Sequence, residues 1–205
     1  MLPADTLPRP HRYDSAVMYP VAIHGRTIQI REIRSDDAAA IARIIGEPEV
    51  LRFTTWKGPA DLDAAEQFVR AAQETAAATP RIEYTLAIVA RDSGEVVGTG
   101  GIRIEDQTGR VGSLRCLLHP DWWHRGIATD TARLAIAFGF GTLSLHRIEA
   151  EAALDNLAAN SVLEKAAFRR NAIRPRHHLA PDGQLRDSVG YAVDREDWAA
   201  AERDR

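Results

Sequence analysis

Two glutamates and one glycine turn have the spacing in this sequence that points to chemistry. Glu149 and Glu151 stand two residues apart in the run RIEAEAAL, so a strand there would direct both carboxylates to one face. A carboxylate in such a position can accept a proton from a reacting group. Gly126 lies in HPDWWHRGIAT, residues 119–129, between a predicted strand and a predicted helix. Because a helix N-terminus attracts phosphate, this turn predicts an anion site.

The composition of the turn at Gly126 suits an anion. The first N–H groups of a helix have no partner within it, and the helix dipole adds positive charge. Gly126 would let the backbone approach a phosphate, Ala128 leaves room beside the first helical turn, and Arg125 adds a charge. A plainer interpretation keeps Gly126 as a turn glycine and Arg125 as a solvated residue. The candidate binding residues are Trp123, His124, Arg125, Gly126, Ile127, Ala128 and Thr129.

HPDWWHRGIAT resembles the acyl-CoA-binding motif of the GNAT superfamily of N-acetyltransferases, usually Arg/Gln-x-x-Gly-x-Gly/Ala. Trp123, Gly126 and Ala128 fall on its three defined positions, although Trp123 replaces the usual Arg or Gln. A His-Pro-x-x-Trp lead-in is common in the branch that resembles the RimJ/RimL-type ribosomal-protein N-terminal acetyltransferases. His124 stands where that branch usually has Gly. Since backbone amides would bind the pyrophosphate, both replacements are compatible with the motif.

The resemblance extends over residues 27–198. PEVLRFTTW is similar to the branch's connection between its first two helices, LHRIEAEAALDNLAANSVLEKAAF to its fifth strand and fourth helix, and DSVGYAVDREDW to its last strand. The implied fold class is α/β (α+β), a GNAT fold with a mixed central sheet of about seven strands flanked by about four helices. In this fold strands four and five splay apart around the pantetheine arm. Freed backbone N–H groups near Cys116, Leu117 and Leu118 would then bind the acetyl carbonyl.

The resemblance also implies where the amine proton goes. Glu151 lies five residues before Asn156, a spacing similar to that of the catalytic glutamate in some N-terminal alanine acetyltransferases. Glu149 stands within the Arg-Ile-Glu motif of the branch. Each glutamate is therefore a candidate for a direct or water-relayed base. The alternative is that one or both are solvated edge charges or partners of Arg147.

Two asparagines complete the implied coenzyme site. Asn156 fits the position whose side chain commonly bonds the pantetheine amides, and Asn160 corresponds to a residue sometimes found near the ligand. Asn156 equally suits a helix N-cap, and the two roles can coexist. Some relatives carry a Tyr seven residues after the first asparagine as acid to the leaving thiolate, where this chain has Leu163. The thiolate then leaves without an acid or another group serves, with Tyr191 as a candidate.

Other reactive side chains have plainer interpretations. Cys116 could act as a nucleophile with His119 or His124 as its base, but a lone cysteine among leucines favours a core position. His177 and His178 are adjacent without a further Cys/His cluster, which favours loop histidines over a metal site. A basic group nearby could meet the 3′-phosphate of coenzyme A or an acidic acceptor, or form a solvated face. Its members are Arg169, Arg170, Arg174 and Arg176.

The elements that position these residues follow from hydrophobic periodicity. Predicted strands cover residues 27–33, 84–91, 95–103, 109–120, 147–154 and 186–193. Predicted helices begin after Ser35 or Asp36, at a capping box of Asp63 and Glu66, after Gly126 and at Asn156. Gly139 and Gly141 mark the expected end of the third helix. Gly98, Gly100 and Gly101 weaken the strand they lie in and predict either close approach by a neighbour or a bulge. The region around PRHHLAPDGQ is expected to be loop-rich.

Composition places the chain among soluble globular proteins, with 205 residues, 45% hydrophobic and 27% charged. Its net charge of -3 lacks the basic footprint of a nucleic-acid-binding domain. No apolar run approaches membrane-spanning length, and the single cysteine fits a reducing cytoplasm. Residues 1–25 are expected to form a flexible N-terminal extension and residues 26–200 the GNAT N-acetyltransferase domain.

The resemblance implies an enzyme, an acetyl-CoA-dependent N-acetyltransferase that moves an acetyl group directly to a primary amine. A protein N-terminal amine is the acceptor expected by analogy with the branch. The alternatives are a small-molecule amine acetyltransferase, acting on an antibiotic or polyamine, and a catalytically weak acyl-CoA-binding sensor. Acetyl-CoA is the expected co-substrate, with no metal and no direct nucleic-acid or membrane partner. We expect a cytoplasmic monomer or homodimer.

Overall fold

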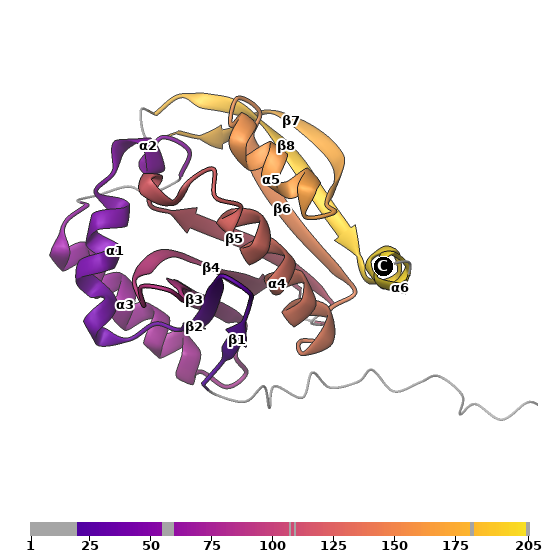
Figure 1. Cartoon of the computed structure of the whole chain (residues 1–205). Helices are drawn as coiled ribbons and strands as arrows, with labels where there is room; N and C mark the ends of the chain where they lie inside the picture. Colours follow the sequence, from indigo (N-terminus) through magenta and orange to yellow (C-terminus); the bar gives the residue numbers. More distant parts are fainter. Residues whose placement is uncertain (1–19, 55–59, 107, 109, 181–182, 204–205) are drawn as a thin grey trace, which may run out of the picture.

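An eight-stranded mixed sheet runs through the domain (Figure 1). The structure is a computed structural model and describes residues 20–54, 60–106, 108, 110–180 and 183–203. The strands are β1 Ala22–His24, β2 Ile28–Glu32, β3 Glu83–Ala90, β4 Val96–Ile104, β5 Val111–Leu118, β6 Arg147–Ala153, β7 Arg169–Leu179 and β8 Leu185–Asp194. Their order is β1-β2-β3-β4-β5-β6-β8-β7, and neighbours are antiparallel except for β5 and β6.

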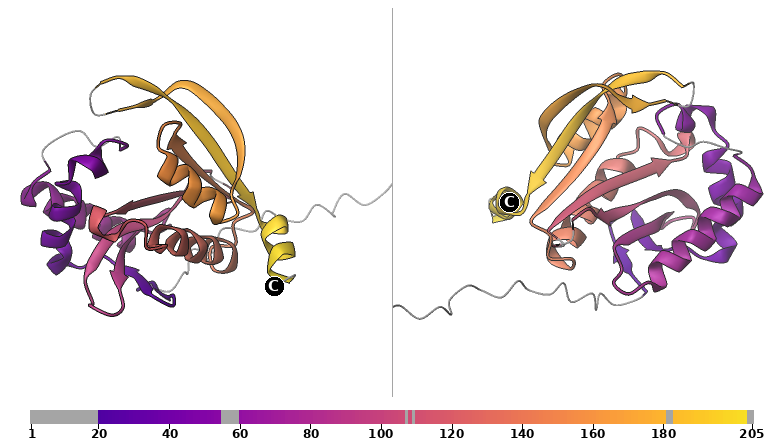
Figure 2. Two further views of the ribbon diagram at one scale, coloured as in Figure 1. Left: turned by 45° about the horizontal axis from the view of Figure 1, so that its top comes forward. Right: turned by 180° about the vertical axis from the view of Figure 1, so that it is seen from behind.

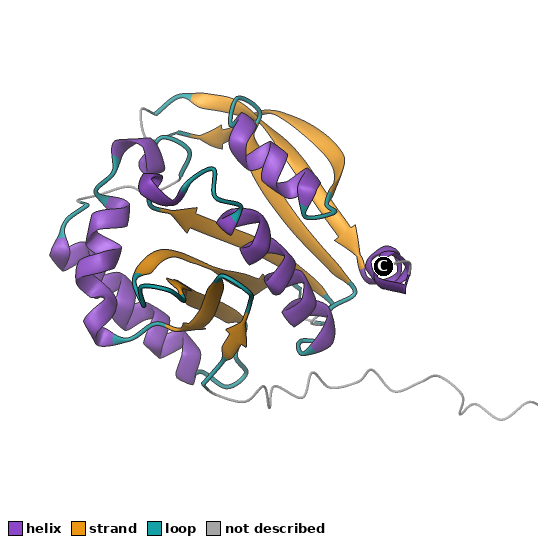
Figure 3. Cartoon of the chain, in the orientation of Figure 1, coloured by secondary structure: helices purple, strands orange, loops and turns teal. Residues whose placement is uncertain are grey.

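Helices cover both faces of this sheet (Figures 2 and 3). They are α1 Ala38–Ile45, α2 Pro48–Leu51, α3 Leu62–Ala77, α4 Ile127–Gly141, α5 Leu157–Lys165 and α6 Arg195–Arg203. The pair α1 and α3 shares one apolar core with one face of the sheet, and α4 packs into a separate core on the opposite face, where α5 also lies. The predicted α/β class is confirmed. Within the described residues the fold has one strand and two helices more than the roughly seven strands and four helices that the family resemblance implies.

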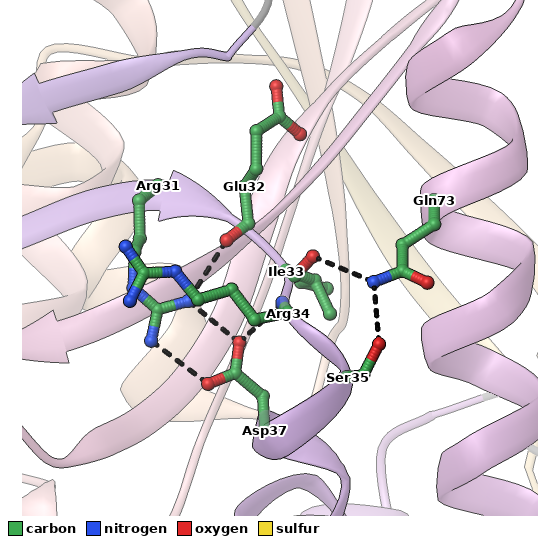
Figure 4. Close-up of polar contacts among 7 residues, drawn as sticks. All are labelled: Arg31, Glu32, Ile33, Arg34, Ser35, Asp37 and Gln73. Atoms are coloured by element: carbon green, nitrogen blue, oxygen red, sulfur yellow. Dashed lines mark hydrogen bonds and ion pairs between the residues drawn. The ribbon is translucent and has the colours of Figure 1, made fainter.

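The start of α1 is held by Asp37 rather than by the predicted cap, Ser35 or Asp36. A short 3-10 turn precedes the helix, and the Asp37 carboxylate accepts the backbone N–H of Arg34 at 2.8 Å. The same carboxylate accepts two hydrogen bonds from the Arg31 guanidinium, at 2.7 and 2.9 Å (Figure 4). This ion pair joins the end of β2 to the helix, which explains why an aspartate is almost completely buried there.

Helix α3 begins two residues earlier than the predicted capping box of Asp63 and Glu66 implies. Asp61 is the N-cap, and its side chain accepts the N–H of the third helical residue at 2.9 Å. Further along the helix, Gln73 reaches the Oγ of Ser35 at 3.3 Å (Figure 4). Helix α3 is therefore fixed to the connection between β2 and α1 by a polar contact as well as by its apolar face.

Two glycines show how closely the layers approach. A Cβ at Gly98 of β4 would lie 2.3 Å from the carbonyl oxygen of Leu117, which confirms the predicted close approach of a neighbouring strand. Gly139 and Gly141 were expected to mark the end of α4; the helix does end at Gly141, but it continues through Gly139. A Cβ at Gly139 would lie 2.7 Å from the side chain of Ile148, so this glycine lets α4 pack tightly against β6.

Three elements were not predicted. Strand β7 occupies most of the region around PRHHLAPDGQ that was expected to be loop-rich, because its polar residues gain backbone partners on β8. Residues 22–24, assigned to the flexible extension, form β1 and pair with β2. Helix α6 follows β8 directly and extends past residue 200. Residues 1–19 of the expected extension lie outside the described part of the chain.

Candidate active site

Strands β5 and β6 start side by side and then separate (Figure 1). Residues 111–113 pair with residues 147–149, and no later pair joins these two strands in the part of the chain that the structure describes. β5 nevertheless stays paired with β4 as far as Leu118, and β6 stays paired with β8 to its end. Strands four and five were expected from the sequence to splay apart. These are β5 and β6 here, because the unpredicted strand β1 shifts the numbering by one, and their separation confirms the expected splay.

The freed edge of β5 exposes alternate backbone groups. The N–H of His119 donates to Val97 of β4 at 2.9 Å, so backbone groups at odd positions point toward β4. By this alternation the N–H groups of Cys116 and Leu118 point toward the opening, and the N–H of Leu117 points toward β4. Of the three predicted oxyanion donors, two therefore lie on the open edge.

The turn before α4 has the geometry of an anion site. Gly126 adopts a left-handed conformation, φ +79°, and a Cβ there would meet nothing within 4 Å. Among the described side chains none caps this helix, so the N–H groups from Ile127 to Thr129 are available to a ligand. The guanidinium of Arg125 lies 4.8 Å from the ring centroid of Trp122, a cation–π contact that holds its charge near the turn.

The residues before this turn are fixed to β5. The indole Nε1 of Trp123 donates to the carbonyl of Leu118 at 2.9 Å, while its ring stays partly exposed. His124 also adopts a left-handed conformation, φ +58°, at the position where the sequence resemblance implies glycine. Nε2 of His119 lies 3.4 Å from Glu47, which connects the segment to the start of α2.

Glu149 is engaged by an arginine. Its Oε1 accepts from Nε of Arg147 at 2.9 Å, and the same guanidinium contacts Asp194 at 2.9 Å. Glu149 also lies in the last β5–β6 pair rather than beyond it. The structure therefore agrees with the alternative interpretation, in which Glu149 is an ion-pair partner of Arg147.

Glu151 lies two residues past the last β5–β6 pair and is contacted by two basic side chains. Nη1 of Arg174 donates to Oε2 at 2.6 Å, and Nδ1 of His177 lies 2.9 Å from Oε1. Partial burial favours the neutral acid, but the hydrogen bond and charge of His177 and the charge of Arg174 outweigh it, so the pKa of Glu151 lies below its ordinary value. Glu151 is ionised at neutral pH and is a weak base.

The two predicted asparagines have different environments. Asn156 caps α5 through its Oδ1, which accepts the N–H of Ala159 at 3.1 Å, and its side chain remains partly exposed. Asn160 is buried, donates to the carbonyl of Ala153 at 3.1 Å and accepts the hydroxyl of Tyr191 at 2.8 Å. These bonds fix Asn160 as a connector between β6, α5 and β8, and they occupy the Tyr191 hydroxyl that was a candidate acid.

The remaining reactive side chains are dispersed. Burial raises the pKa of the Cys116 thiol to about 12, so the thiol stays protonated and is not a nucleophile at neutral pH. Arg169 pairs with Asp197, and Arg170 with Glu164, so the basic group does not converge on one ligand. The sequence interpretation missed that His177 and Arg174 meet at Glu151; the adjacent histidines were visible, but the pairing of β7 was not.

The sheet opens between two parallel strands, and β5 is followed by a helix whose N-terminus has no side-chain cap among the described residues, an arrangement that can hold an anionic ligand beside the opening. The chain matches the family model of the acetyltransferase (GNAT) domain over residues 27–169. The protein therefore belongs to the GNAT acetyltransferases and is an N-acetyltransferase. Members of this family use acetyl-CoA.

Relatives cover nearly the whole chain. The uncharacterized N-acetyltransferase YoaA of Bacillus subtilis is 28% identical over 177 residues, which is 86% of this chain and 97% of that protein. RimJ of Mycobacterium smegmatis, in complex with CoA-disulfide, has a TM-score of 0.78 at 22% identity and covers 90% of this chain and 96% of its own. The ribosomal-protein-S5-alanine acetyltransferase of Vibrio fischeri has a TM-score of 0.76 at 18% identity, covering 87% and 98%.

None of the helices that the structure describes is both long enough and apolar enough to cross a bilayer.

Proposed function

We propose that this chain transfers an acetyl group directly from acetyl-CoA to a protein N-terminal amine in the cytoplasm. The observation that carries the proposal is the separation of β5 from β6, which leaves the N–H groups of Cys116 and Leu118 along an open edge ending near α4. The similarity to RimJ and to a ribosomal-protein-S5-alanine acetyltransferase supports a peptide acceptor by analogy.

The residues present fit the co-substrate. Its pyrophosphate would bind the N–H groups from Ile127 to Thr129, with the charge of Arg125 beside them. The pantetheine arm would run along the open edge of β5, where the partly exposed Asn156 can bond its amides. The acetyl carbonyl would accept an N–H of this edge, which stabilises the oxyanion that forms when the amine attacks.

Of the two candidate carboxylates, Glu151 suits the reaction better than Glu149. Glu151 lies beyond the last β5–β6 pair, where the sheet is open, and Glu149 lies within the paired segment. Both side chains project from the face of β6 opposite the buried Ile148 and Ala150, which pack with α4. The acceptor amine would therefore approach from the face of the sheet that carries α1 and α3.

A transfer assay with isotope-labelled acetyl-CoA tests the proposal. The acceptors are peptides with a free N-terminus, the same peptides with a blocked N-terminus, polyamines and aminoglycosides. We expect label in the free peptides and none in the blocked ones, which separates the N-terminal amine from lysine side chains. Label in a polyamine or aminoglycoside alone would instead establish a small-molecule acetyltransferase. Tight binding of coenzyme A without label in any acceptor would establish a sensor.

A further inference from the structure

Strand β7, at the edge of the sheet and separated from β6 by β8, contains a bulge. Arg174 pairs with Ser188 and His178 pairs with Arg186, so residues 175–177 lie opposite the single residue Asp187. Within the bulge Arg176 has a left-handed backbone, φ +53°, and its N–H donates to Asp187 at 2.9 Å. A non-glycine residue in this conformation is strained, and such residues cluster at functional sites.

The bulge determines which side chains reach Glu151. In a regular strand Arg174 and His177, three residues apart, would point to opposite faces of the sheet. Here both contact the same carboxylate, at 2.6 Å and 2.9 Å. Because a bulge can re-aim a side chain, the extra residues in β7 account for the placement of His177 on the face of the sheet that carries Glu151.

A glycine on the intervening strand keeps the path open. Gly190 of β8 pairs with Glu151 on one side and with Ala172 on the other. A Cβ at Gly190 would lie 3.1 Å from Nη1 of Arg174 and 2.6 Å from Oδ1 of Asn171. The guanidinium therefore crosses β8 above Gly190 to reach β6.

We propose that His177 is the residue that accepts the proton of the acceptor amine, and that Glu151 and Arg174 are positioning residues for it. This inference rests on the proposed acetyl transfer. The amine nitrogen attacks the thioester carbon, the N–C bond forms and the C–S bond breaks. The proton from nitrogen passes to Nε2 of His177, and coenzyme A leaves as the thiolate, so that charge and atoms balance.

The contacts of the imidazole suit this role. An ionised carboxylate only accepts hydrogen bonds, so Nδ1 of His177 is the donor to Glu151, and Nε2 is the ring nitrogen at which a proton can be gained or lost. The His177 side chain is 56% exposed and can therefore be reached by a substrate. The charged groups around it are Glu151 on β6, Arg174 on its own strand, and Asp187 and Arg186 on β8, of which Arg186 pairs with Asp155.

The test compares His177→Gln with a matched control, His178→Gln, in which the neighbouring histidine undergoes the same substitution. The substrate is the amine that the wild-type chain acetylates fastest in the acceptor panel. We expect His177→Gln to lower kcat/KM by roughly 10²- to 10⁴-fold and to remove one ionisation from the pH–rate profile. Affinity for coenzyme A and the melting temperature should stay as in the wild type, His178→Gln should keep its rate, and added imidazole should partly restore His177→Ala.

A Glu151→Gln variant separates base from positioning residue. If His177 is the base, Glu151→Gln lowers kcat but keeps the ionisation in the pH–rate profile. Loss of the ionisation in Glu151→Gln, with its retention in His177→Gln, would overturn the inference and make the glutamate the base. Equal rates for His177→Gln and the wild type would overturn it as well. A wild-type chain that acetylates no amine at all would instead remove the proposed function, and this inference with it.

Discussion

The indole N–H of Trp123 donates a hydrogen bond to the carbonyl of Leu118 across 2.9 Å. This bond joins the segment that leads into α4 to the last residue of β5. The two halves of the candidate coenzyme site, the N–H groups of the helix and the open strand edge, are thereby held at a fixed separation.

Loss of this bond should weaken coenzyme binding. We expect Trp123→Phe to raise the Kd for coenzyme A about twofold to tenfold, since a hydrogen bond of this kind contributes about 0.5–1.5 kcal/mol. Calorimetric titration measures the change. Trp122→Phe is the matched control, because it keeps an aromatic ring under Arg125 and leaves the hydrogen bond between Trp123 and Leu118 in place. Equal affinity in Trp123→Phe and the wild type would show that the bond does not position the site.

The backbone at Gly126 offers a test of the anion site with an internal control. Gly126 and Gly94 both have left-handed backbones, φ +79° and +72°, and at neither would a Cβ meet anything within 4 Å. Alanine at either position should cost about 1–2 kcal/mol of unfolding free energy, because the conformation is strained for it. We expect Gly126→Ala alone to lose affinity for coenzyme A as well, since its methyl group would enter the space of the pyrophosphate. Similar affinities in both variants would contradict the placement of the ligand.

The ion pairs of Glu151 predict a pH dependence of stability. Its pKa in the folded protein lies below the ordinary value of 4.5, because His177 and Arg174 outweigh the effect of burial. The unfolded chain then takes up its proton first as the pH falls. The stabilisation is therefore complete above the ordinary value and is lost as the pH falls through the folded value.

Urea unfolding from neutral to acidic pH measures this effect. We expect the stability of Glu151→Gln to fall less steeply with acidification than that of the wild type. Parallel pH profiles for the two proteins would mean that the contacts of Glu151 with Arg174 and His177 add no stability in solution.

The thiol of Cys116, a residue that is only partly exposed, should react slowly in the folded protein. Cys116 is the single cysteine of the chain, and burial raises its pKa to about 12. A thiol reagent at neutral pH should therefore modify the native protein far more slowly than the urea-unfolded chain, as read by absorbance of the released chromophore. Cys116→Ala should keep most of the transfer activity. Complete loss of transfer with an unchanged melting temperature would revive a nucleophilic role.

Local patterns in the sequence determined much of the site. The alternation of Ile148 and Ala150 with Glu149 and Glu151 places the carboxylates on one face of β6 because a strand has a period of two. Gly126 between a strand and a helix is likewise a local feature, since a left-handed residue before a helix favours glycine. The motif around it was sufficient to identify the family resemblance, which the family match confirms.

Only the tertiary structure decided which groups surround Glu151. β7 has no apolar periodicity on which a prediction could rest, because its charged and polar residues lie at an edge of the sheet and their pairing is set by β8. The bulge that turns His177 toward Glu151, and the glycine that lets Arg174 cross β8, depend on how three strands pair, and α5 separates β6 from the other two in the sequence. Likewise, the sequence suggested Asn160 as a ligand-binding residue. In the structure its side chain instead forms hydrogen bonds with β6, the start of α5 and β8. Pairing and burial of this kind depend on contacts between distant segments, which a local pattern does not contain.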